Sequence, residues 1–315
     1  MIEGVRGVRA VEGLDAIKYT KIISTFHNLC IENNFELIVL PTLEKADLFS
    51  RTVGEFTEIV TKQMYNFKDK KGRELVLRPE GTAGVMRNYI EKKYKIEKFY
   101  FYSEQMFRYE RPQKGRFREF HQVGAEIIGS TIGNIKPISQ IVLLGMNFID
   151  KLYDNNDEIE LKINSIGTNQ DRKIYINKLE EYFQKHKSSL SEDSKIRLIN
   201  NPLRILDSKD KNDIKISLDA PKFSEYRSEA SNNDYELFKE QISSIPYQED
   251  QNLVRGLDYY NGITFEFTPK GKSGSQDTVG GGGQYDSLST LIGDKQINGV
   301  GFAFGVDRLL DLLEN

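Results

Sequence analysis

The sequence contains a single cysteine, Cys30, among 315 residues. One cysteine cannot form an intrachain disulfide, so a disulfide framework is excluded and a reducing compartment is expected. No segment approaches the roughly 18 consecutive apolar residues of a membrane-spanning helix. The start of the chain, residues 1–7, lacks the basic-then-apolar pattern of a signal peptide. These absences predict a cytoplasmic protein with no membrane partner.

An excess of positive charge is also lacking. The chain has 44 Lys and Arg against 47 Asp and Glu, a formal net charge of −3. No global basic field therefore indicates a nucleic-acid partner, and any such contact must be local. The length suits two domains, or one large domain with an insertion.

Hydrophobic periodicity predicts a set of helices and strands in the first half of the chain. They are a helix over residues 14–33, a strand over 35–40 that runs into Pro41, a strand, turn and helix over 75–84, and strands over 99–109 and 119–129. The last two strands should form an antiparallel pair. The charged loop between them is expected to be mobile and solvated.

The composition and the hydrophobic pattern change between residues 168 and 226, where charged residues dominate and helical periodicity is loose. We interpret this segment as a small helical insertion in a main domain formed by residues 1–167 and 227–315. It has 12 Lys and Arg against 10 Asp and Glu. On charge alone, a nucleic-acid surface and a merely solvated helical module are equally compatible with it.

The most informative stretch is Arg255–Tyr260, which places one guanidinium and two phenols immediately before residues 263–267. The latter alternate apolar and polar, which predicts a strand with one buried face. An Arg and two Tyr held there suit a preorganised site for a small polar ligand with an anionic group. The alternative is a core strand edged by tyrosines, with Arg255 paired to Asp258.

Two later segments extend this pattern. The four glycines at 280–283 allow close approach of a ligand or a neighbouring strand, but they match neither the phosphate loop nor the dinucleotide fingerprint. Residues 299–313 predict a small-residue strand that passes into an apolar helix. Arg308 lies in the first turn of that helix, where a positive charge opposes the helix dipole. An anionic ligand is expected there; the alternative is an ion pair with Asp307 or Asp311.

Four segments in this order resemble the catalytic part of the histidyl-tRNA synthetases: residues 77–84, 106–122, 255–260 and 301–308. The resemblance runs from Val5 to Leu313. The second and fourth segments resemble motifs two and three of class II aminoacyl-tRNA synthetases, and the helix and strand ending at Pro41 resemble motif one, the dimer interface of that class. The resemblance implies an α+β fold, an antiparallel sheet flanked by helices with a small helical insertion, and not a doubly wound parallel sheet.

The implied activity is that of a histidine–tRNA ligase, a homodimer that joins L-histidine and ATP into histidyl-adenylate and then charges histidine tRNA. The first step requires two anions to be aligned and their charge neutralised, which positioning and fixed cations can supply. Mg²⁺ would bridge phosphate oxygens of ATP, and no residue is assigned as a metal ligand.

The resemblance assigns the ATP contacts and the catalytic cations. Arg108 would clamp the α-phosphate and the histidine carboxylate, and Arg255 would approach the α-phosphate from the other side. The remaining ATP contacts would be Glu110 with the adenine amino group, Phe120 stacked on the base, and Arg116 and Arg308 on the polyphosphate.

The histidine contacts follow in the same way. The ammonium group needs acceptors, and the imidazole nitrogens need one donor and one acceptor. The implied residues are Glu80, Thr82 and Gln122 around the ammonium with Gly81 between the first two, Glu126 and Tyr260 at the imidazole, and Tyr259 as a pocket wall. Glu126 also lies in the apolar run 123–128, where an unused, unpaired carboxylate would be costly.

Two departures from the family pattern are visible. Gln284 stands where the family usually has Arg, and the chain ends at Asn315, where synthetases of this family continue into an anticodon-binding domain. A catalytic fragment or truncated form is therefore expected. Length alone favours a related protein, the regulatory subunit of ATP phosphoribosyltransferase, which binds histidine as a sensor. The residues favour the enzyme, because a sensor does not need Arg108, Arg255 and Arg308 together with the intact run 80–82. A generic nucleotide-binding module without catalysis is a more distant alternative.

Overall fold

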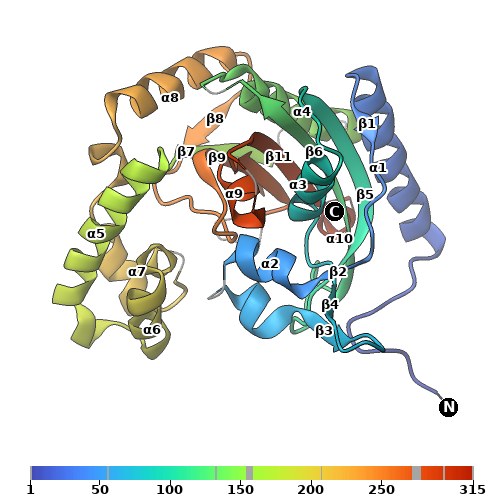
Figure 1. Cartoon of the computed structure of the whole chain (residues 1–315), viewed down its shortest axis with the longest axis horizontal. Coiled ribbons are helices and arrows are strands. Elements are labelled where there is room, and N and C mark those ends of the chain that lie inside the picture. The colour runs from blue at the N-terminus through green and yellow to red at the C-terminus, as the bar shows by residue number, and fades with distance from the viewer. Residues whose placement is uncertain are drawn as a thin grey trace.

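A computed structural model describes residues 2–54, 57–131, 133–153, 159–206, 208–271, 278–293 and 295–313. Its centre is a main sheet with the strand order β1-β5-β6-β11-β10-β9-β7-β8 (Figure 1). Only the pairs β1–β5 and β7–β8 are parallel among these neighbours. The strands are β1 Glu36–Leu37, β5 Lys98–Phe107, β6 Glu119–Ser130, β7 Ile159–Ser165, β8 Tyr247–Glu249, β9 Asn261–Pro269, β10 Gly280–Gln284 and β11 Asn298–Gly305. The expected α+β fold, a largely antiparallel sheet flanked by helices, is confirmed.

The outer face of the main sheet packs on the hydrophobic core. Three of its helices are α1 Gly13–Glu32, α4 Lys136–Leu152 and α10 Val306–Leu312. Alternation along β6 sends Val123, Ala125 and Ile127 into this core, where they are fully buried. The residues between them therefore point to the opposite, inner face.

The inner face of the main sheet carries shorter elements and more polar side chains. It is covered by α2 Ala46–Val53, α3 Thr82–Glu91 and α9 Leu288–Ile292, which lie inside the curve of the sheet in Figure 1. A small sheet of order β2-β4-β3 lies beside them. Its strands are β2 Leu43–Lys45, β3 Tyr65–Lys68 and β4 Glu74–Leu77, and the π-helix η1 Ile59–Gln63 precedes β3.

A helical segment, residues 169–225, projects from the end of β7 (Figure 1). It comprises α5 Asn169–Lys185, η3 Lys187–Ser189, α6 Glu192–Asn200, η4 Pro202–Ile205, α7 Lys211–Leu218 and η5 Phe223–Glu225. The following helix, α8 Glu229–Gln241, buries Phe238 in the core of the outer face. No helix in the part of the chain that the structure describes is long and apolar enough to cross a membrane.

The helix expected over residues 14–33 is confirmed as α1, and the expected antiparallel pair is confirmed as β5 and β6. The strand expected over 35–40 is wrong beyond Leu37, because β1 ends there. Side chains then take over the backbone of Leu40: Glu104 accepts its N–H at 3.2 Å, and Arg78 donates to its carbonyl at 2.5 Å. These bonds replace the sheet pairing that a longer strand would need.

The single buried face expected for residues 263–267 is also wrong. They lie in β9, and Thr264, on the inner face, is as fully buried as Phe265 on the outer face. The polar residues of β9 point to the inner face of the sheet. That face holds charged side chains and is not exposed to solvent at this strand.

Candidate active site

The floor of the candidate site is a patch of the inner face whose central positions are glycine or alanine. The strand register aligns two rows, Gly124–Ala303–Gly281–Glu266 and Glu126–Gly301–Gly283–Thr264. A Cβ on Gly301 would lie 1.6 Å from a carboxylate oxygen of Glu126, and a Cβ on Gly281 would lie 2.6 Å from Nη1 of Arg255. Glycine at these two positions therefore lets charged side chains lie directly against the sheet.

Glu126 is fully buried at one end of this floor. The Thr82 hydroxyl donates to Oε1 at 2.7 Å, and the Tyr285 hydroxyl donates to Oε2 at 2.6 Å. Burial raises the pKa of Glu126 to about 8, although both hydrogen bonds oppose the shift. The sequence indicated that this carboxylate needed partners. It did not identify Tyr285, whose only signal is its place directly after the glycine-rich strand.

Glu80 lies in the turn between β4 and α3. Its carboxylate accepts the backbone N–H groups of Thr82 at 2.8 Å and Ala83 at 2.9 Å, and the Tyr259 hydroxyl at 3.2 Å. Burial raises its pKa, while the two backbone donors and Arg108 act in the opposite direction. Glu80 therefore satisfies the first N–H groups of α3 as well as facing the site.

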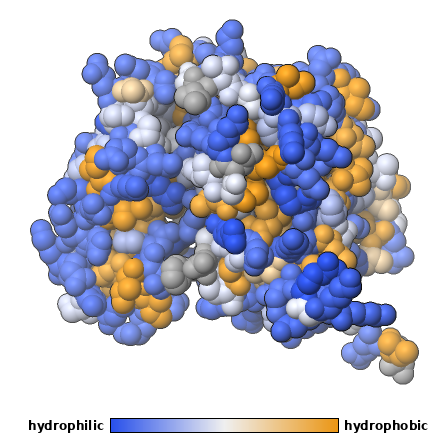
Figure 2. All heavy atoms as spheres, in the orientation of Figure 1, coloured by the Kyte–Doolittle hydropathy of each residue, from blue (hydrophilic) through white to orange (hydrophobic). Residues whose placement is uncertain are grey.

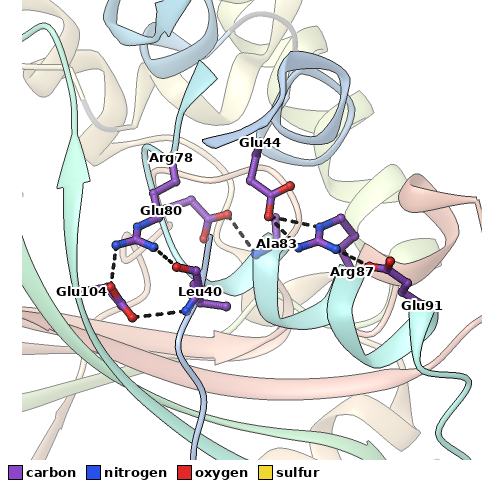
Figure 3. A network of polar contacts seen from close by, with 8 residues as sticks. All are labelled: Leu40, Glu44, Arg78, Glu80, Ala83, Arg87, Glu91 and Glu104. Atoms are coloured by element: carbon purple, nitrogen blue, oxygen red, sulfur yellow. Dashed lines mark hydrogen bonds and ion pairs between the residues drawn. The ribbon is translucent and has the colours of Figure 1, made fainter. Parts of the chain in front are cut away.

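Arg78 holds this turn in place, a role that the sequence did not predict. Its side chain donates to Glu104 at 2.6 Å, to the Leu40 carbonyl at 2.5 Å and to the Gln105 carbonyl at 2.7 Å (Figure 3). Figure 3 also shows Arg87 of α3 between Glu44 and Glu91. The position of Glu80 thus depends on contacts from β5 and from the chain around Leu40.

Tyr259 and Tyr260 lie immediately before β9, as the sequence places them before the predicted strand. They occupy a loop that ends at β9, and both are buried. Their ring centroids lie 4.7 Å apart, and the Tyr285 ring lies 5.9 Å from Tyr259. Burial raises the pKa of all three phenols, to about 12 for Tyr260. The phenols therefore stay protonated and can donate hydrogen bonds.

Arg255 pairs with Glu266 of β9. The pairing with Asp258 considered from the sequence is wrong, since Asp258 instead contacts Arg204 at 3.2 Å. Thr278 donates to the second oxygen of Glu266 at 2.8 Å, so the anchor of Arg255 is itself held. Nε of Arg255 is buried and has no hydrogen-bond partner among the described residues. Burial works against the charged form, but Glu266 and Tyr260 keep the pKa of Arg255 above its usual value.

Arg108 follows β5 and lies near the carboxylates of Glu80 and Glu110. Its Nε donates to the Pro79 carbonyl at 2.8 Å, and its guanidinium lies 5.2 Å from the ring centroid of Phe120. Burial lowers its pKa, while Glu110 and Glu80 counteract the shift. Arg108 is thus close enough to both glutamates for their charges to act on it.

Arg308 donates to the carbonyl of Thr278. The pair with Asp307 considered from the sequence is wrong: Asp307 contacts Arg9 at 3.1 Å and accepts the N–H of His121 at 3.2 Å. Burial, together with the charges of Arg116 and Arg108, lowers the pKa of Arg308 to about 10. The guanidinium remains charged at neutral pH and lies in a field of like charge.

The loop between β5 and β6 is only in part the solvated connection expected, because residues 111, 113 and 114 are exposed whereas residues 115–118 are half-buried. The backbone N–H of Arg118 donates to the Gly7 carbonyl at 2.7 Å, and Arg9 lies over the Phe117 ring at 4.4 Å. Within the loop, Arg116 contacts Glu110 at 3.4 Å. The amino-terminal arm therefore packs against the loop that carries two of the predicted ATP contacts.

The remaining predicted site residues lie on or beside the same floor. Phe120 and Gln122 are half-buried on the inner face of β6, and a Cβ on Gly81 would lie 2.5 Å from the ring of buried Tyr102. Gln284 accepts the backbone N–H of Ile263 at 2.8 Å. An arginine at 284 could not accept this bond, because its side chain has only donors.

The raised pKa of Glu126 predicts how stability depends on pH. The folded protein binds this proton more tightly than the unfolded chain, so the contribution is present below the usual pKa of 4.5 and is lost as pH rises through about 8. We expect the thermal midpoint to fall over this range by less in Glu126→Gln than in the unchanged protein. The difference between the two curves isolates Glu126 from Asp286, whose pKa burial also raises. Parallel curves would contradict a buried, titrating Glu126.

A sequence model of the histidyl-tRNA synthetase family matches residues 7–167 and 202–309. The chain belongs to the histidyl-tRNA synthetase family. A relative from Hydrogenovibrio crunogenus, a histidine–tRNA ligase, is 42% identical over 318 residues that cover 99% of this chain and 73% of the relative. The resemblance inferred from the four motifs is thereby confirmed, and membership places the chain among the aminoacyl-tRNA synthetases.

Solved structures agree with this family. Apo histidyl-tRNA synthetase of S. aureus superposes with a TM-score of 0.77 at 33% identity, covering 100% of this chain and 74% of that one. A Bacillus halodurans protein described as an ATP phosphoribosyltransferase regulatory subunit/histidyl-tRNA synthetase gives a TM-score of 0.70 at 23% identity, over 100% of this chain and 84% of that one. The second likeness shows the shared fold alone and does not favour the regulatory alternative.

Proposed function

We propose that the chain binds ATP and L-histidine on the inner face of the main sheet and forms histidyl-adenylate. A histidine carboxylate oxygen bonds to the α-phosphorus as the bond to the β-phosphate bridge breaks, releasing pyrophosphate. The terminal ribose hydroxyl of histidine tRNA then attacks the acyl carbon, and AMP leaves. ATP use also follows from the family to which the chain belongs.

The observation that carries this proposal is the clustering of guanidinium groups over the glycine floor. Burial is the main cause of the lowered pKa of Arg308, and the positive charges of Arg116, Arg108 and Arg255 lower it further. Like charges gathered in a buried site are stabilised when a polyanion binds among them. A nucleoside triphosphate next to an amino-acid carboxylate matches this field.

The cluster divides into tasks by position. We assign the α-phosphate and the histidine carboxylate to Arg108, which lies near Glu80, and the opposite side of the α-phosphate to Arg255, anchored on Glu266. Both cations are fixed before the reaction, so they stabilise the developing charge without reorganising. The other proposed ATP contacts are Glu110 and Phe120 at the adenine, with Arg116 and Arg308 along the polyphosphate.

The carboxylates and phenols define the proposed histidine pocket. Glu80, Thr82 and Gln122 would accept hydrogen bonds from the ammonium group of histidine. Glu126 and Tyr260 would face the imidazole nitrogens, and Tyr259 would lie beside them. Glu126 is oriented by the Thr82 and Tyr285 hydroxyls, each of which can donate or accept. A pocket whose polar groups need both ring nitrogens rejects apolar isosteres, because its own groups would be left unpaired.

Mg²⁺ belongs to the same proposal. Among the described residues, no group of three or more His, Cys, Asp or Glu side chains is placed to hold a metal ion. Mg²⁺ commonly binds through substrate phosphates and keeps several waters, so it fits a site in which the ATP oxygens supply most of its ligands.

We also propose a homodimer formed through the region of α1, β1 and β2. This region exposes several large apolar side chains, and Figure 2 shows hydrophobic groups gathered on the side of the molecule where α1 lies. They include Leu14, Ile17, Ile31, Leu37, Val39 and Leu43. Apolar residues in such number indicate a covered surface. The proposed location is the cytoplasm, where the buried thiol of Cys30 stays reduced.

The direct test is histidine-dependent exchange of labelled pyrophosphate into ATP. We expect the folded chain with Mg²⁺ to catalyse this exchange, because the cation cluster and the carboxylate pocket meet on one floor. Omitting histidine or replacing it with another amino acid is the control. Histidine binding without any exchange would refute the proposed function and support a sensor.

Transfer to tRNA should be sensitive to salt in this 315-residue chain. We propose residues 168–226 as an insertion domain, and their small excess of Lys and Arg over Asp and Glu offers few cations for phosphate contacts. Because affinity for nucleic acids rests largely on phosphate neutralisation, charging should need high tRNA concentration and low salt and respond little to anticodon changes. The measurement is aminoacylation of histidine tRNA across a salt series, beside pyrophosphate exchange as the control. Efficient charging at physiological salt with strong anticodon preference would contradict the expectation.

A further inference from the structure

The loop that carries Arg255, Tyr259 and Tyr260 has no regular secondary structure, yet three proposed site residues depend on its conformation. Contacts from outside the loop must therefore fix it. The guanidinium of Arg172, in the first turn of α5, provides two of them. Its Nη1 donates to the backbone carbonyl of Asp258 at 2.8 Å and to that of Tyr260 at 3.2 Å. These two carbonyls flank Tyr259.

The Asp258 side chain is held from the same side. Its Oδ1 accepts from Asn201 at 3.1 Å and from Arg204 at 3.2 Å, and both donors belong to the helical segment. Its backbone N–H donates to the Val53 carbonyl at the end of α2 at 3.2 Å. A Cβ on Gly54 would lie 2.2 Å from Oδ2 of Asp258. Asp258 thus joins the loop to α2 and to the helical segment at once.

Arg172 starts from a rigid anchor. The preceding residue, Asp171, is buried and accepts the N–H of Thr168 at 2.9 Å in the capping box of α5. It also accepts the Ser228 N–H at 3.1 Å and the Ser231 hydroxyl, which ties the start of α5 to the start of α8. Because α8 packs into the core of the outer face, the position of Arg172 is defined relative to the main sheet.

The packing around these bonds is incomplete. An open cleft of about 350 Å³ lies between α2, α5, η4 and α9, and Arg172, Asn201 and Asp258 line it. Nε of Arg172 and Oδ1 of Asn201 are buried without hydrogen-bond partners among the residues described. Where side chains do not fill the interface, the few polar bonds determine how the loop sits against the helical segment.

We propose that Arg172, supported by the contacts of Asp258 with Asn201 and Arg204, is a positioning residue for the histidine pocket. It holds the backbone on both sides of Tyr259, so the placement of the helical segment sets where the two phenols point. The two carbonyls that Arg172 holds flank Tyr259, which donates to Glu80 of the proposed histidine pocket. This arrangement, the Arg172 clamp, therefore acts on histidine more than on ATP. The inference rests on the proposed function, since it deepens the role of the same site.

The test compares three variants by pyrophosphate exchange. Arg172→Met should raise the KM for histidine by roughly 10–100-fold, the range expected for losing hydrogen bonds from a charged group. The KM for ATP should change by less than about twofold, because Arg172 acts on the histidine pocket. A loss of folded protein would lower kcat and alter neither KM, so it cannot imitate this result. Arg172→Lys should give a smaller rise, because an ammonium can still donate to a carbonyl. Arg227→Met is the matched control: Arg227 is a guanidinium outside the loop that stacks on Tyr235.

A second measurement follows from the reciprocity of linked sites. Histidine should slow amide hydrogen exchange in residues 169–176 and 201–206 of the unchanged protein, and Arg172→Met should abolish this effect. Unchanged histidine KM in Arg172→Met, equal rises for both substrates, or the same rise in Arg227→Met would each overturn the proposal. If Arg172→Met fails to fold, Arg172→Lys and Asp258→Asn decide it by the same ratio of KM values.

The two proposals can fail separately. An unchanged protein that binds histidine but catalyses no exchange refutes the proposed function, and calorimetric histidine affinities of the same variants then decide the clamp. Normal exchange in the unchanged protein with no selective effect of Arg172→Met refutes the clamp alone.

Discussion

Replacing Arg255 by alanine is expected to lower the rate of pyrophosphate exchange by on the order of 10²–10³, with little change in the KM for ATP. The guanidinium is prepositioned by Glu266 and lies against Gly281, where no side chain separates it from the sheet. A cation fixed in this way acts mainly on charge that develops at the α-phosphate. The measurement is steady-state exchange with ATP and histidine varied separately.

The control for this variant must address Glu266, which the substitution leaves with Thr278 as its remaining described hydrogen-bond partner. The double variant Arg255→Met/Glu266→Gln removes both charges, so a similar loss of rate would assign the effect to the cation itself. Arg73→Ala, which breaks an exposed ion pair with Asp69, should leave exchange unchanged. Near-normal turnover with a raised KM would show that Arg255 binds only the ground-state substrate.

Replacing Glu126 by glutamine is expected to raise the KM for histidine by roughly 10–100-fold, because a buried hydrogen bond to a charged or ionisable group is altered. The KM for ATP should remain nearly unchanged, since Glu126 lies at the end of the floor that Thr82 and Tyr285 occupy. Preference for histidine over a ring-methylated analogue should fall as well. Exchange assays with both amino acids measure the change.

Two further variants sharpen this test. Tyr285→Phe removes the hydroxyl that donates to Glu126 and should weaken histidine binding in the same direction. Glu119→Gln changes a glutamate of the same strand whose side chain alternation places on the outer face, so it should have no selective effect. If Glu126→Gln left the affinities for histidine and its methylated analogue unchanged, the assignment of the imidazole pocket would be wrong.

Much of the local structure was predictable because it depends on short-range patterns. The apolar spacing of residues 14–33 predicts α1, and alternation on either side of a charged loop predicts β5 and β6. The motifs predicted the family for a related reason, since each one keeps its chemistry within a few positions. The predicted roles of Arg255, Glu126 and the other site residues remain predictions until the variants are measured.

The partners of those residues could not be read from the sequence. Arg255 pairs with Glu266 and not with nearby Asp258, because β10 brings a glycine where the guanidinium must lie. Glu126 accepts a hydrogen bond from the hydroxyl of Tyr285, 159 positions away, because β11 pairs both with β6 and with β10, which ends just before Tyr285. Local periodicity carries no information about which distant strands will be adjacent.

By itself, the sequence determined which side chains could do chemistry here, their approximate secondary structure and the family. Only the tertiary structure decided that Tyr259 and Tyr260 are buried, that β9 is buried on both faces and that Arg172 reaches the backbone around Tyr259. The physical reason is that helix and strand propensities act over a few residues, whereas burial and hydrogen-bond partners are set by the packing of the whole chain.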